Sequence, residues 1–281
     1  MVHPYRPCRM SNGFGAEYEN YQLYESGSGF RIAVADQRSE NVDQRSRSDI
    51  RCERSRQYAL EEALRLKETH GGEVIVISMG GEESARVLRS GLAMGADRAI
   101  HLLDPKFKGS DEFRAAATLA KAIQKDGGAD LVLAGVQSDD LGTGMTGTMM
   151  SEFLGWAHAT VVVAVQAAAD ATSLKVRREL EGGINETVEL PMPAVLTIQF
   201  GINQPRYASL KGIIAAKKKE FTSWSAADLG LSETEIGTAG AMYEVMEILV
   251  PERRNKVELF TGTPEEAAAK LVGKLKEAKV L

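Results

Sequence analysis

The residues best suited to chemistry lie in a single polar loop. It reads Gly135-Val-Gln-Ser-Asp-Asp-Leu-Gly-Thr-Gly-Met-Thr-Gly147 and connects an apolar run to a predicted helix at residues 148–154. Glycines and hydroxyl groups before a helix start suit a nucleotide, because backbone N–H groups there can face a phosphate. A glycine-rich loop is a weak motif by itself, so a long surface turn is an equally good interpretation.

The side chains do not favour hydrolysis or metal binding. Ser138, Asp139 and Asp140 stand together, but no histidine lies close in sequence to complete a catalytic relay. The two aspartates are better suited to accept hydrogen bonds from ribose hydroxyls or from the backbone. The histidines and cysteines are scattered along the chain: His3, His70, His101, His158, Cys8 and Cys52. This spacing predicts no metal site and no disulfide framework, and His101 is expected to pack within a strand or at its edge.

The composition is that of an ordinary globular protein. Of the 281 residues, 43% are apolar and 26% are charged, enough for one large core or one core with an appendage. No run of about 18 apolar residues occurs, and the first residues lack the apolar core of a secretory signal. The formal net charge of −5, with basic clusters only at 45–56 and 217–219, does not favour nucleic acid as a partner. We therefore expect a cytoplasmic protein.

A regular alternation of helix and strand patterns begins at residue 58. Short β-branched runs between the helices are typical of strands buried in a parallel sheet. The predicted helices lie at 58–70, at 83–94 and after Ser110 as a possible N-cap, and the strands at 74–77, 99–103 and 131–135. This order predicts a doubly wound α/β sheet, with ligands bound at the carboxyl ends of its strands, after Ile77 and Leu133.

The second half of the chain predicts a smaller antiparallel part. Strand patterns occur at 161–165, 174–180, 187–190 and 193–200, and we interpret the last three as an antiparallel extension that makes the sheet mixed. Residues 220–262 contain only short apolar pieces, such as Met246–Val250, and a final helix is predicted to start near Pro264. We expect this end to form an arm that reaches away from the core.

The first 57 residues differ in composition from the rest. Their only apolar run is Phe30–Ala35, and residues 36–56 are dominated by Arg, Ser, Asp and Gln. Low hydrophobicity of this kind is typical of disorder. We therefore predict that residues 36–56 are disordered.

Four motifs after residue 175 resemble the beta subunit of electron transfer flavoprotein in their order and spacing. They are Val176-Arg-Arg-Glu-Leu-Glu-Gly-Gly183, Leu190-Pro-Met-Pro-Ala-Val-Leu-Thr197, Asn203-Gln-Pro-Arg-Tyr-Ala-Ser-Leu210 and Ala216-Lys-Lys-Lys219. Tyr58–Lys67 and Ala93–Asp97 resemble the family as well. The resemblance therefore covers residues 58 to about 220 without a break.

This resemblance implies a mostly parallel, Rossmann-like sheet of the adenine nucleotide alpha hydrolase type in residues 58–220, within a subunit that has no independent catalysis. The subunit would pair with an alpha subunit that holds most of the redox FAD site, and residues 221–281 would form an arm and a helix that contact this partner. Electrons would arrive from flavin dehydrogenases, such as the acyl-CoA dehydrogenases of fatty acid oxidation. They would leave toward a membrane quinone oxidoreductase, without insertion of this chain into the membrane.

In that family, the loop matched here by residues 135–146 holds AMP or, in electron-bifurcating members, a second FAD. The residues expected to bind this nucleotide are Met79, Gly135, Val136, Gln137, Ser138, Asp139, Asp140, Leu141, Gly142, Thr143, Gly144, Met145 and Thr146. Where the family commonly has Asn-Gln-Thr-Gly, this chain has Leu141-Gly-Thr-Gly144. This change removes two amide side chains that could contact a phosphate or a ribose. The added glycine allows the backbone to approach the ligand more closely. Both AMP and FAD therefore stay open as the bound nucleotide.

The amino-terminal part departs from the family pattern. The family begins with an apolar strand and has an Asn-Pro pair before the helix that matches Tyr58. Residues 1–20 contain no such strand, and Glu53-Arg-Ser-Arg56 replaces the pair. A sheet without this central strand would expose the edges of its neighbours. We hypothesise that stretches within residues 1–57 come from a displaced reading frame or a wrong gene start.

The family's recognition loop corresponds to residues 203–219, which keep this name below. Its leucine, here Leu210, is implied to insert into an apolar pocket of the dehydrogenase, with Tyr207 and Ile213 as supporting docking residues. The lysines at 217–219 would steer acidic partners, and Ala215 replaces a further lysine of many relatives. The alternative interpretation is a short amphipathic helix packed on the core and followed by a solvated lysine cluster.

Two other functions stay open at this point. A free-standing adenine-nucleotide-binding module would explain the sheet and the glycine-rich loop, but it does not explain the motifs after residue 175. An electron-bifurcating flavoprotein subunit would differ from an ordinary carrier in binding a second FAD in place of AMP. The nucleotide content of the purified protein would therefore separate these functions.

Overall fold

The computed structural model describes residues 30–37, 54–138, 142–243 and 258–281. The chain divides into two compact units, residues 1–244 and residues 245–281. Within the described ranges, no helix is both long enough and apolar enough to cross a membrane.

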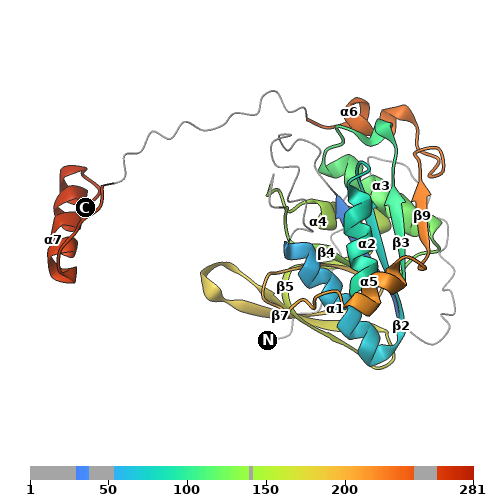
Figure 1. Ribbon diagram of the computed structural model, residues 1–281, viewed down its shortest axis with the longest axis horizontal. Helices are drawn as coiled ribbons and strands as arrows, with labels where there is room; N and C mark the ends of the chain where they lie inside the picture. The colour runs from blue at the N-terminus through green and yellow to red at the C-terminus, as the bar shows by residue number, and fades with distance from the viewer. Residues whose placement is uncertain (1–29, 38–53, 139–141, 244–257) are drawn as a thin grey trace. The chain divides into compact units, whose positions relative to one another are not determined.

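The larger unit is built on a mixed sheet (Figure 1). Its nine described strands lie in the order β7-β6-β5-β8-β4-β1-β2-β3-β9. The strands are β1 (Phe30–Gln37), β2 (Gly72–Met79), β3 (Arg98–Leu102), β4 (Leu131–Gly135), β5 (Ala157–Ala167), β6 (Ser173–Glu179), β7 (Asn185–Pro191), β8 (Ala194–Ile198) and β9 (Phe221–Trp224). All neighbours pair in parallel except β5 with β6 and β6 with β7, so the predicted doubly wound, mostly parallel sheet is confirmed.

The helices cover both faces of this sheet. The helices of the larger unit are α1 (Arg54–His70), α2 (Ser84–Met94), α3 (Glu112–Lys125), α4 (Thr146–Leu154), α5 (Leu210–Ala216) and α6 (Gly237–Gly240), with short 3-10 turns η2 (Pro105–Phe107), η3 (Glu181–Gly183) and η4 (Glu233–Glu235). One apolar core lies between the sheet and α1, α2 and α5. A second core lies between the other face and α3 and α4. The sheet is therefore buried on both sides, as its β-branched strands predict.

One strand was assigned wrongly from the sequence. β8 was expected in the antiparallel extension, but it lies between β4 and β5 and pairs with both in parallel. All five of its residues are buried, which suits an interior position. The antiparallel extension is the hairpin of β6 and β7 alone, attached to the edge of β5. A short apolar run does not distinguish these two positions.

The sheet has a central strand, so the expectation of a missing one is wrong. β1 pairs in parallel with β2 on one side and with β4 on the other. The edges of its neighbours are therefore covered. The predicted disorder of residues 36–56 is wrong for 36–37, which end β1, and for 54–56, which begin α1. For residues 38–53 this prediction lies outside the described residues. The reading-frame hypothesis for residues 1–57 stays a hypothesis.

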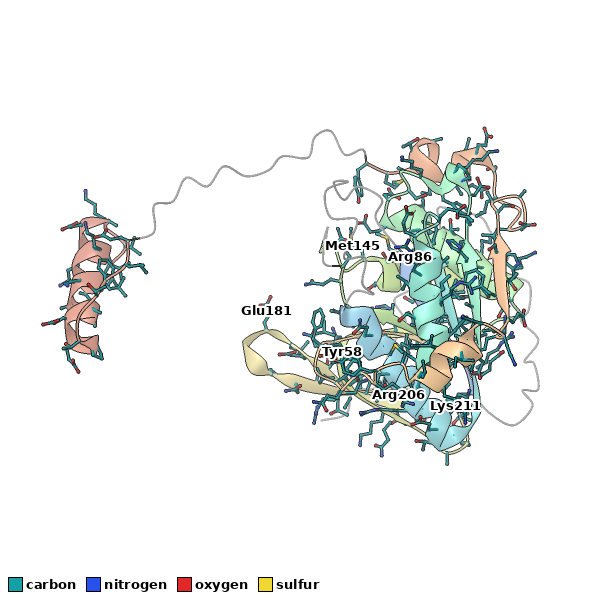
Figure 2. The ribbon with its side chains drawn as sticks, in the orientation of Figure 1. Tyr58, Arg86, Met145, Glu181, Arg206 and Lys211 are labelled. Atoms are coloured by element: carbon teal, nitrogen blue, oxygen red, sulfur yellow. The ribbon has the colours of Figure 1, made fainter. Side chains whose placement is uncertain are left out.

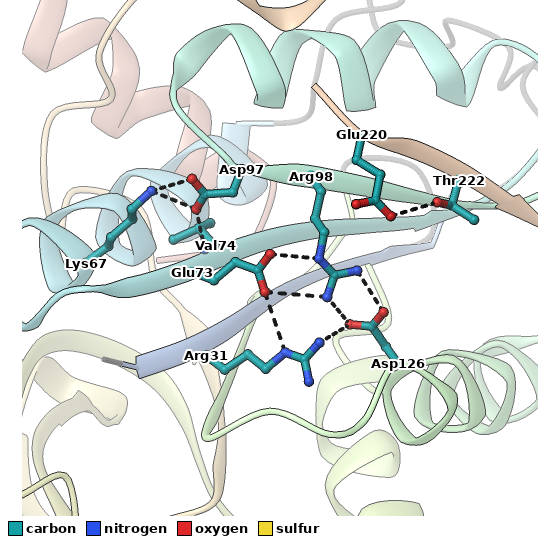
Figure 3. Close-up of polar contacts among 9 residues, drawn as sticks. All are labelled: Arg31, Lys67, Glu73, Val74, Asp97, Arg98, Asp126, Glu220 and Thr222. Atoms are coloured by element: carbon teal, nitrogen blue, oxygen red, sulfur yellow. Dashed lines mark hydrogen bonds and ion pairs between the residues drawn. The ribbon is translucent and has the colours of Figure 1, made fainter. Parts of the chain in front are cut away.

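Charged side chains connect the amino ends of the parallel strands (Figure 3). Arg31 donates from its backbone N–H to Asp130 at 2.7 Å and from its guanidinium to Asp126 at 3.0 Å. Arg98 donates to Glu73 at 2.8 Å and to Asp126 at 2.7 Å. These contacts join β1, β2 and β3 to the end of α3. β1 is thus held by specific polar contacts as well as by sheet pairing.

The carboxyl-terminal region differs from the predicted arm. Residues 221–243 were assigned to the arm, but β9 pairs with β3 and α6 lies in the larger unit. The second unit contains α7 (Pro264–Glu277), which begins with a capping box of Thr263 and Glu266 and has no buried residue. The predicted apolar piece at residues 246–250 lies outside the described residues.

The position of β1 yields a stability test. Ile32 is fully buried at 0% exposure, so Ile32→Ala should lower the free energy of unfolding by about 2–5 kcal/mol through the cavity it leaves. Ile184→Ala is the matched control, because Ile184 is 62% exposed and should cost less than about 0.5 kcal/mol. Urea denaturation followed by circular dichroism measures both. Equal costs would contradict a central position for residues 30–37.

Candidate functional site

The glycine-rich loop lies where the topology predicts a ligand. We call residues 135–147 the glycine loop. It follows the carboxyl end of β4, while Met79 ends β2, and β1 lies between these two strands. The parallel order therefore brings the turn after Met79 and the glycine loop to one edge of the sheet. Asp139, Asp140 and Leu141, which were predicted to bind nucleotide, lie outside the described residues.

His101 fixes the turn that follows β2. Its side chain is 2% exposed, and its Nε2 lies 3.1 Å from the carbonyl oxygens of both Gly80 and Gly81. A neutral imidazole that carries its proton on Nε2 can donate to these carbonyls. The prediction that His101 packs within a strand is confirmed, but its contact with the turn was missed. A polar residue within the apolar run of β3 is the feature of the sequence that could have indicated this contact.

The described part of the glycine loop is a compact turn. Gly142 and Gly144 have φ values of 65° and 64°, in the left-handed region that favours glycine. The hydroxyl of Ser138 accepts from the Gly142 N–H at 3.3 Å. A Cβ at Gly144 would lie 3.1 Å from the Val136 carbonyl oxygen, so a side chain there would crowd the loop backbone. The loop thus has the close backbone turns that a phosphate cradle requires.

The start of α4 also fits a phosphate. A Cβ at Gly147 would lie 2.6 Å from the Thr197 side chain, so α4 begins in direct contact with β8. Its N-cap residue, Met145, makes no side-chain capping hydrogen bond. A helix start of this kind presents N–H groups and a partial positive charge to an anion. The residues present therefore fit the phosphate of a nucleotide.

The recognition loop carries its predicted docking residues on the surface. Tyr207 is 98% exposed, Leu210 is 75% exposed and Ile213 is 47% exposed. Ile214, which was not predicted, is 57% exposed beside them. Ser209 caps α5 by accepting from the Gly212 N–H at 3.0 Å. The alternative interpretation correctly predicted a short helix, α5. Its large apolar side chains, however, are exposed and do not pack on the core.

The first half of the recognition loop is anchored to α1. Arg206 donates to the Glu61 carboxylate from Nε at 2.8 Å, from Nη2 at 3.0 Å and from its backbone N–H at 3.0 Å. Its Nη1 also donates to Glu68 at 2.5 Å. Asn203 donates to Glu62 at 2.9 Å and to the Tyr58 carbonyl at 3.0 Å. The labelled Tyr58, Arg206 and Lys211 in Figure 2 follow this surface from α1 to α5.

The pKa values of the anchoring carboxylates are shifted in different directions. Burial alone would raise the pKa of Glu61, but hydrogen bonds and charge from Arg206, with Arg65, bring this pKa below its ordinary value. The hydrogen bond from Arg206 also lowers the pKa of Glu68. Burial raises the pKa of Glu62, and the hydrogen bond from Asn203 only partly offsets it. The ion pair at Glu61 is therefore the charged anchor of the loop.

The last lysine of the basic cluster anchors the other end of the loop. Lys219 donates from Nζ to the carbonyl oxygens of Leu92, at 3.0 Å, and Ala96, near the end of α2. Burial lowers the pKa of this lysine. The prediction of a solvated cluster is therefore wrong for Lys219, whereas Lys217 and Lys218 are exposed. A cation near a helix carboxyl end satisfies its unpaired carbonyls.

The sequence of the chain is similar to those of known proteins across both of these loops. Residues 44–229 match the model of the electron transfer flavoprotein domain. The chain is 42% identical over 224 residues to an electron transfer flavoprotein subunit beta of Methylophilus methylotrophus, covering 79% of this chain and 84% of the relative. It is 38% identical to the subunit beta of Bos taurus, covering 79% and 82%. It is also 38% identical to the caffeyl-CoA reductase-Etf complex subunit CarD of Acetobacterium woodii, covering 79% and 85%.

The Arg206 anchor can be tested by stability and pH. Arg206→Met keeps the length of the side chain but removes the main partner of Glu61, so the free energy of unfolding should fall by about 2 kcal/mol at pH 7. Because the pKa of Glu61 is lowered by folding, this stabilisation exists above its ordinary value of 4.5 and is lost as the pH falls below it. The deficit of the variant should therefore shrink in acid.

The control for this test is Lys217→Met, which removes an exposed cation from the same loop. Its cost in urea denaturation should be small at every pH. A deficit of Arg206→Met that is equal to that of the control, or that does not change with pH, would contradict the role of Arg206.

Proposed function

The chain belongs to the beta-subunit family of electron transfer flavoproteins, and we propose that it is the beta subunit of a heterodimeric electron carrier. Members of this family generally carry electrons rather than catalyse a reaction of their own. The proposal rests above all on the family match through residues 44–229, which includes both the glycine loop and the recognition loop. An alpha subunit completes the carrier and holds most of the redox FAD, which supplies reversible electron transfer when bound.

We further propose that the glycine loop binds an adenine nucleotide, either AMP or a second FAD. The left-handed turns at Gly142 and Gly144 support this assignment. The start of α4, packed on β8 through Gly147, supports it as well, since its N–H groups suit a phosphate. Met79 ends β2 and brings a neighbouring turn to the same sheet edge. AMP would make this subunit part of an ordinary carrier, and a second FAD would make it part of a bifurcating one.

The recognition loop is proposed to dock flavin dehydrogenases, such as acyl-CoA dehydrogenases. An apolar side chain that is 75% exposed, Leu210, has no role in the core of this unit. Its neighbours Tyr207 and Ile213 enlarge the apolar surface, and binding energy often concentrates in such a few central residues. A small surface suits a carrier that must also release its partner and deliver electrons to a membrane quinone oxidoreductase.

The second unit, residues 245–281, is proposed to contact the alpha subunit through α7. The apolar residues Leu271, Val272 and Leu275 recur at helical spacing on this helix. Leu271 is 47% exposed and Val272 is 43% exposed, so the second unit leaves this stripe uncovered. An alpha subunit that covers the stripe would bury it in the complex.

Nucleotide release tests the cofactor assignment. We expect the purified, yellow complex of both subunits to release one FAD and one AMP on denaturation, as measured by chromatography. Two molecules of FAD would instead identify a bifurcating subunit. A colourless homodimer that binds ATP would support the free-standing nucleotide-binding module and overturn the proposed carrier.

Replacement of Leu210 tests docking. Leu210→Ala should lower the rate constant for electron transfer from an acyl-CoA dehydrogenase at least about tenfold, because a central apolar anchor is lost. Flavin content and heterodimer stability should stay unchanged, since Leu210 is exposed. Ile184→Ala, at an exposed apolar residue of the hairpin, serves as the control for electron transfer. Loss of flavin in Leu210→Ala would show that the residue belongs to the core.

A further inference from the structure

Glu112 joins the glycine loop to a distant part of the chain. It is the first residue of α3, and its side chain is only 4% exposed. One carboxylate oxygen accepts from the Thr143 hydroxyl of the glycine loop at 2.9 Å. The other accepts from the hydroxyl of Tyr243. A single carboxylate therefore contacts segments that are 100 residues apart in sequence.

Tyr243 belongs to a segment that is hydrogen-bonded to the start of α3. We call residues 236–243 the strap. Ser110 was predicted as the N-cap of α3, but Asp111 takes that place by accepting from the Arg114 N–H at 2.9 Å. Ser110 instead accepts from the Gly237 N–H at 3.0 Å. Asp111 also accepts from the backbone N–H of Met242, and the Arg114 side chain donates to the carbonyl of Gly240.

The position of Glu112 explains why it holds both hydroxyls. A buried carboxylate is costly unless its oxygens accept hydrogen bonds. The amino end of a helix favours a negative charge, and Glu112 is the first residue of α3. Each of its oxygens has one hydroxyl donor, from Thr143 on one side and from Tyr243 on the other. Movement of either segment therefore changes the surroundings of the same side chain.

We propose that Glu112 is a positioning residue for the glycine loop and couples nucleotide binding there to docking of the strap. This inference rests on the proposed nucleotide function of the glycine loop. A nucleotide bound at the glycine loop holds Thr143 against Glu112 and so favours the arrangement in which Tyr243 is also bound. By linkage, a docked strap strengthens nucleotide binding to the same extent.

The test is a double-mutant cycle in the complex of both subunits, with AMP as the probe. Thr143→Val and Tyr243→Phe each remove one hydroxyl and should weaken AMP binding about three- to tenfold, measured by calorimetric titration of nucleotide-depleted complex. The double variant should lose less than the product of the two factors, because both act through Glu112. Thr143→Ser, which restores the hydroxyl, should recover most of the affinity.

Two further measurements separate positioning from general stability. In a Glu112→Ala background, Tyr243→Phe should have no additional effect on AMP binding. Addition of AMP should slow hydrogen exchange in the strap of the unaltered complex, and Thr143→Val should abolish this protection. Lys121→Ala, at an exposed residue of α3, should change neither result.

The outcomes separate the coupling through Glu112 from the proposed nucleotide binding by the glycine loop. If the unaltered complex does not bind AMP, both the AMP assignment and this inference are overturned. If it binds AMP while Tyr243→Phe has no effect, or while the two single effects simply multiply, only the coupling through Glu112 is overturned.

Discussion

The fold depends on charge neutralisation at the amino ends of its parallel strands. Arg98 is only 14% exposed in its side chain, and Asp126 is 9% exposed, so neither charge can rely on water. The hydrogen bond to Asp126 raises the pKa of Arg98 despite burial. Removing one partner from such a pair costs about 3–5 kcal/mol, because the other charge is left buried. The pair therefore fixes how β3 and α3 meet, and β1 joins the same group through Arg31.

A second group of polar contacts connects helix α1 to the same end of the sheet. Lys67, near the end of α1, donates to Asp97 at 2.5 Å, and Asp97 accepts from the Val74 N–H at 2.8 Å (Figure 3). The helix, the loop before β3 and the start of β2 are thus held together. With one end of each strand fixed, the opposite ends must come together at the other edge of the sheet. The glycine loop and the turn after β2 owe their proximity to this arrangement.

Local sequence patterns predicted most elements because each element is encoded within a short window. The β-branched runs predicted the parallel strands, and the glycines predicted the loop at the sheet edge. The same patterns could not place β8, since a short buried run has no signal for the direction of its neighbours. The apolar run Phe30–Ala35 was not recognised as the central strand β1, because the residues around it are polar and rich in arginine. The contacts of Arg206, Lys219 and Glu112 were missed because their partners lie far away in sequence, where no spacing rule applies.

The two anchors of the recognition loop have a consequence for the docking role proposed for it. Arg206 and Lys219 fix the ends of the loop on two different helices, so its length is constrained by the distance between α1 and α2. The exposed side chains between them, Tyr207, Leu210 and Ile213, carry no such constraint. Their identities can therefore change without disturbing the core. Under the proposed docking role, the backbone of the loop can stay fixed while the side chains that would contact a partner are replaced.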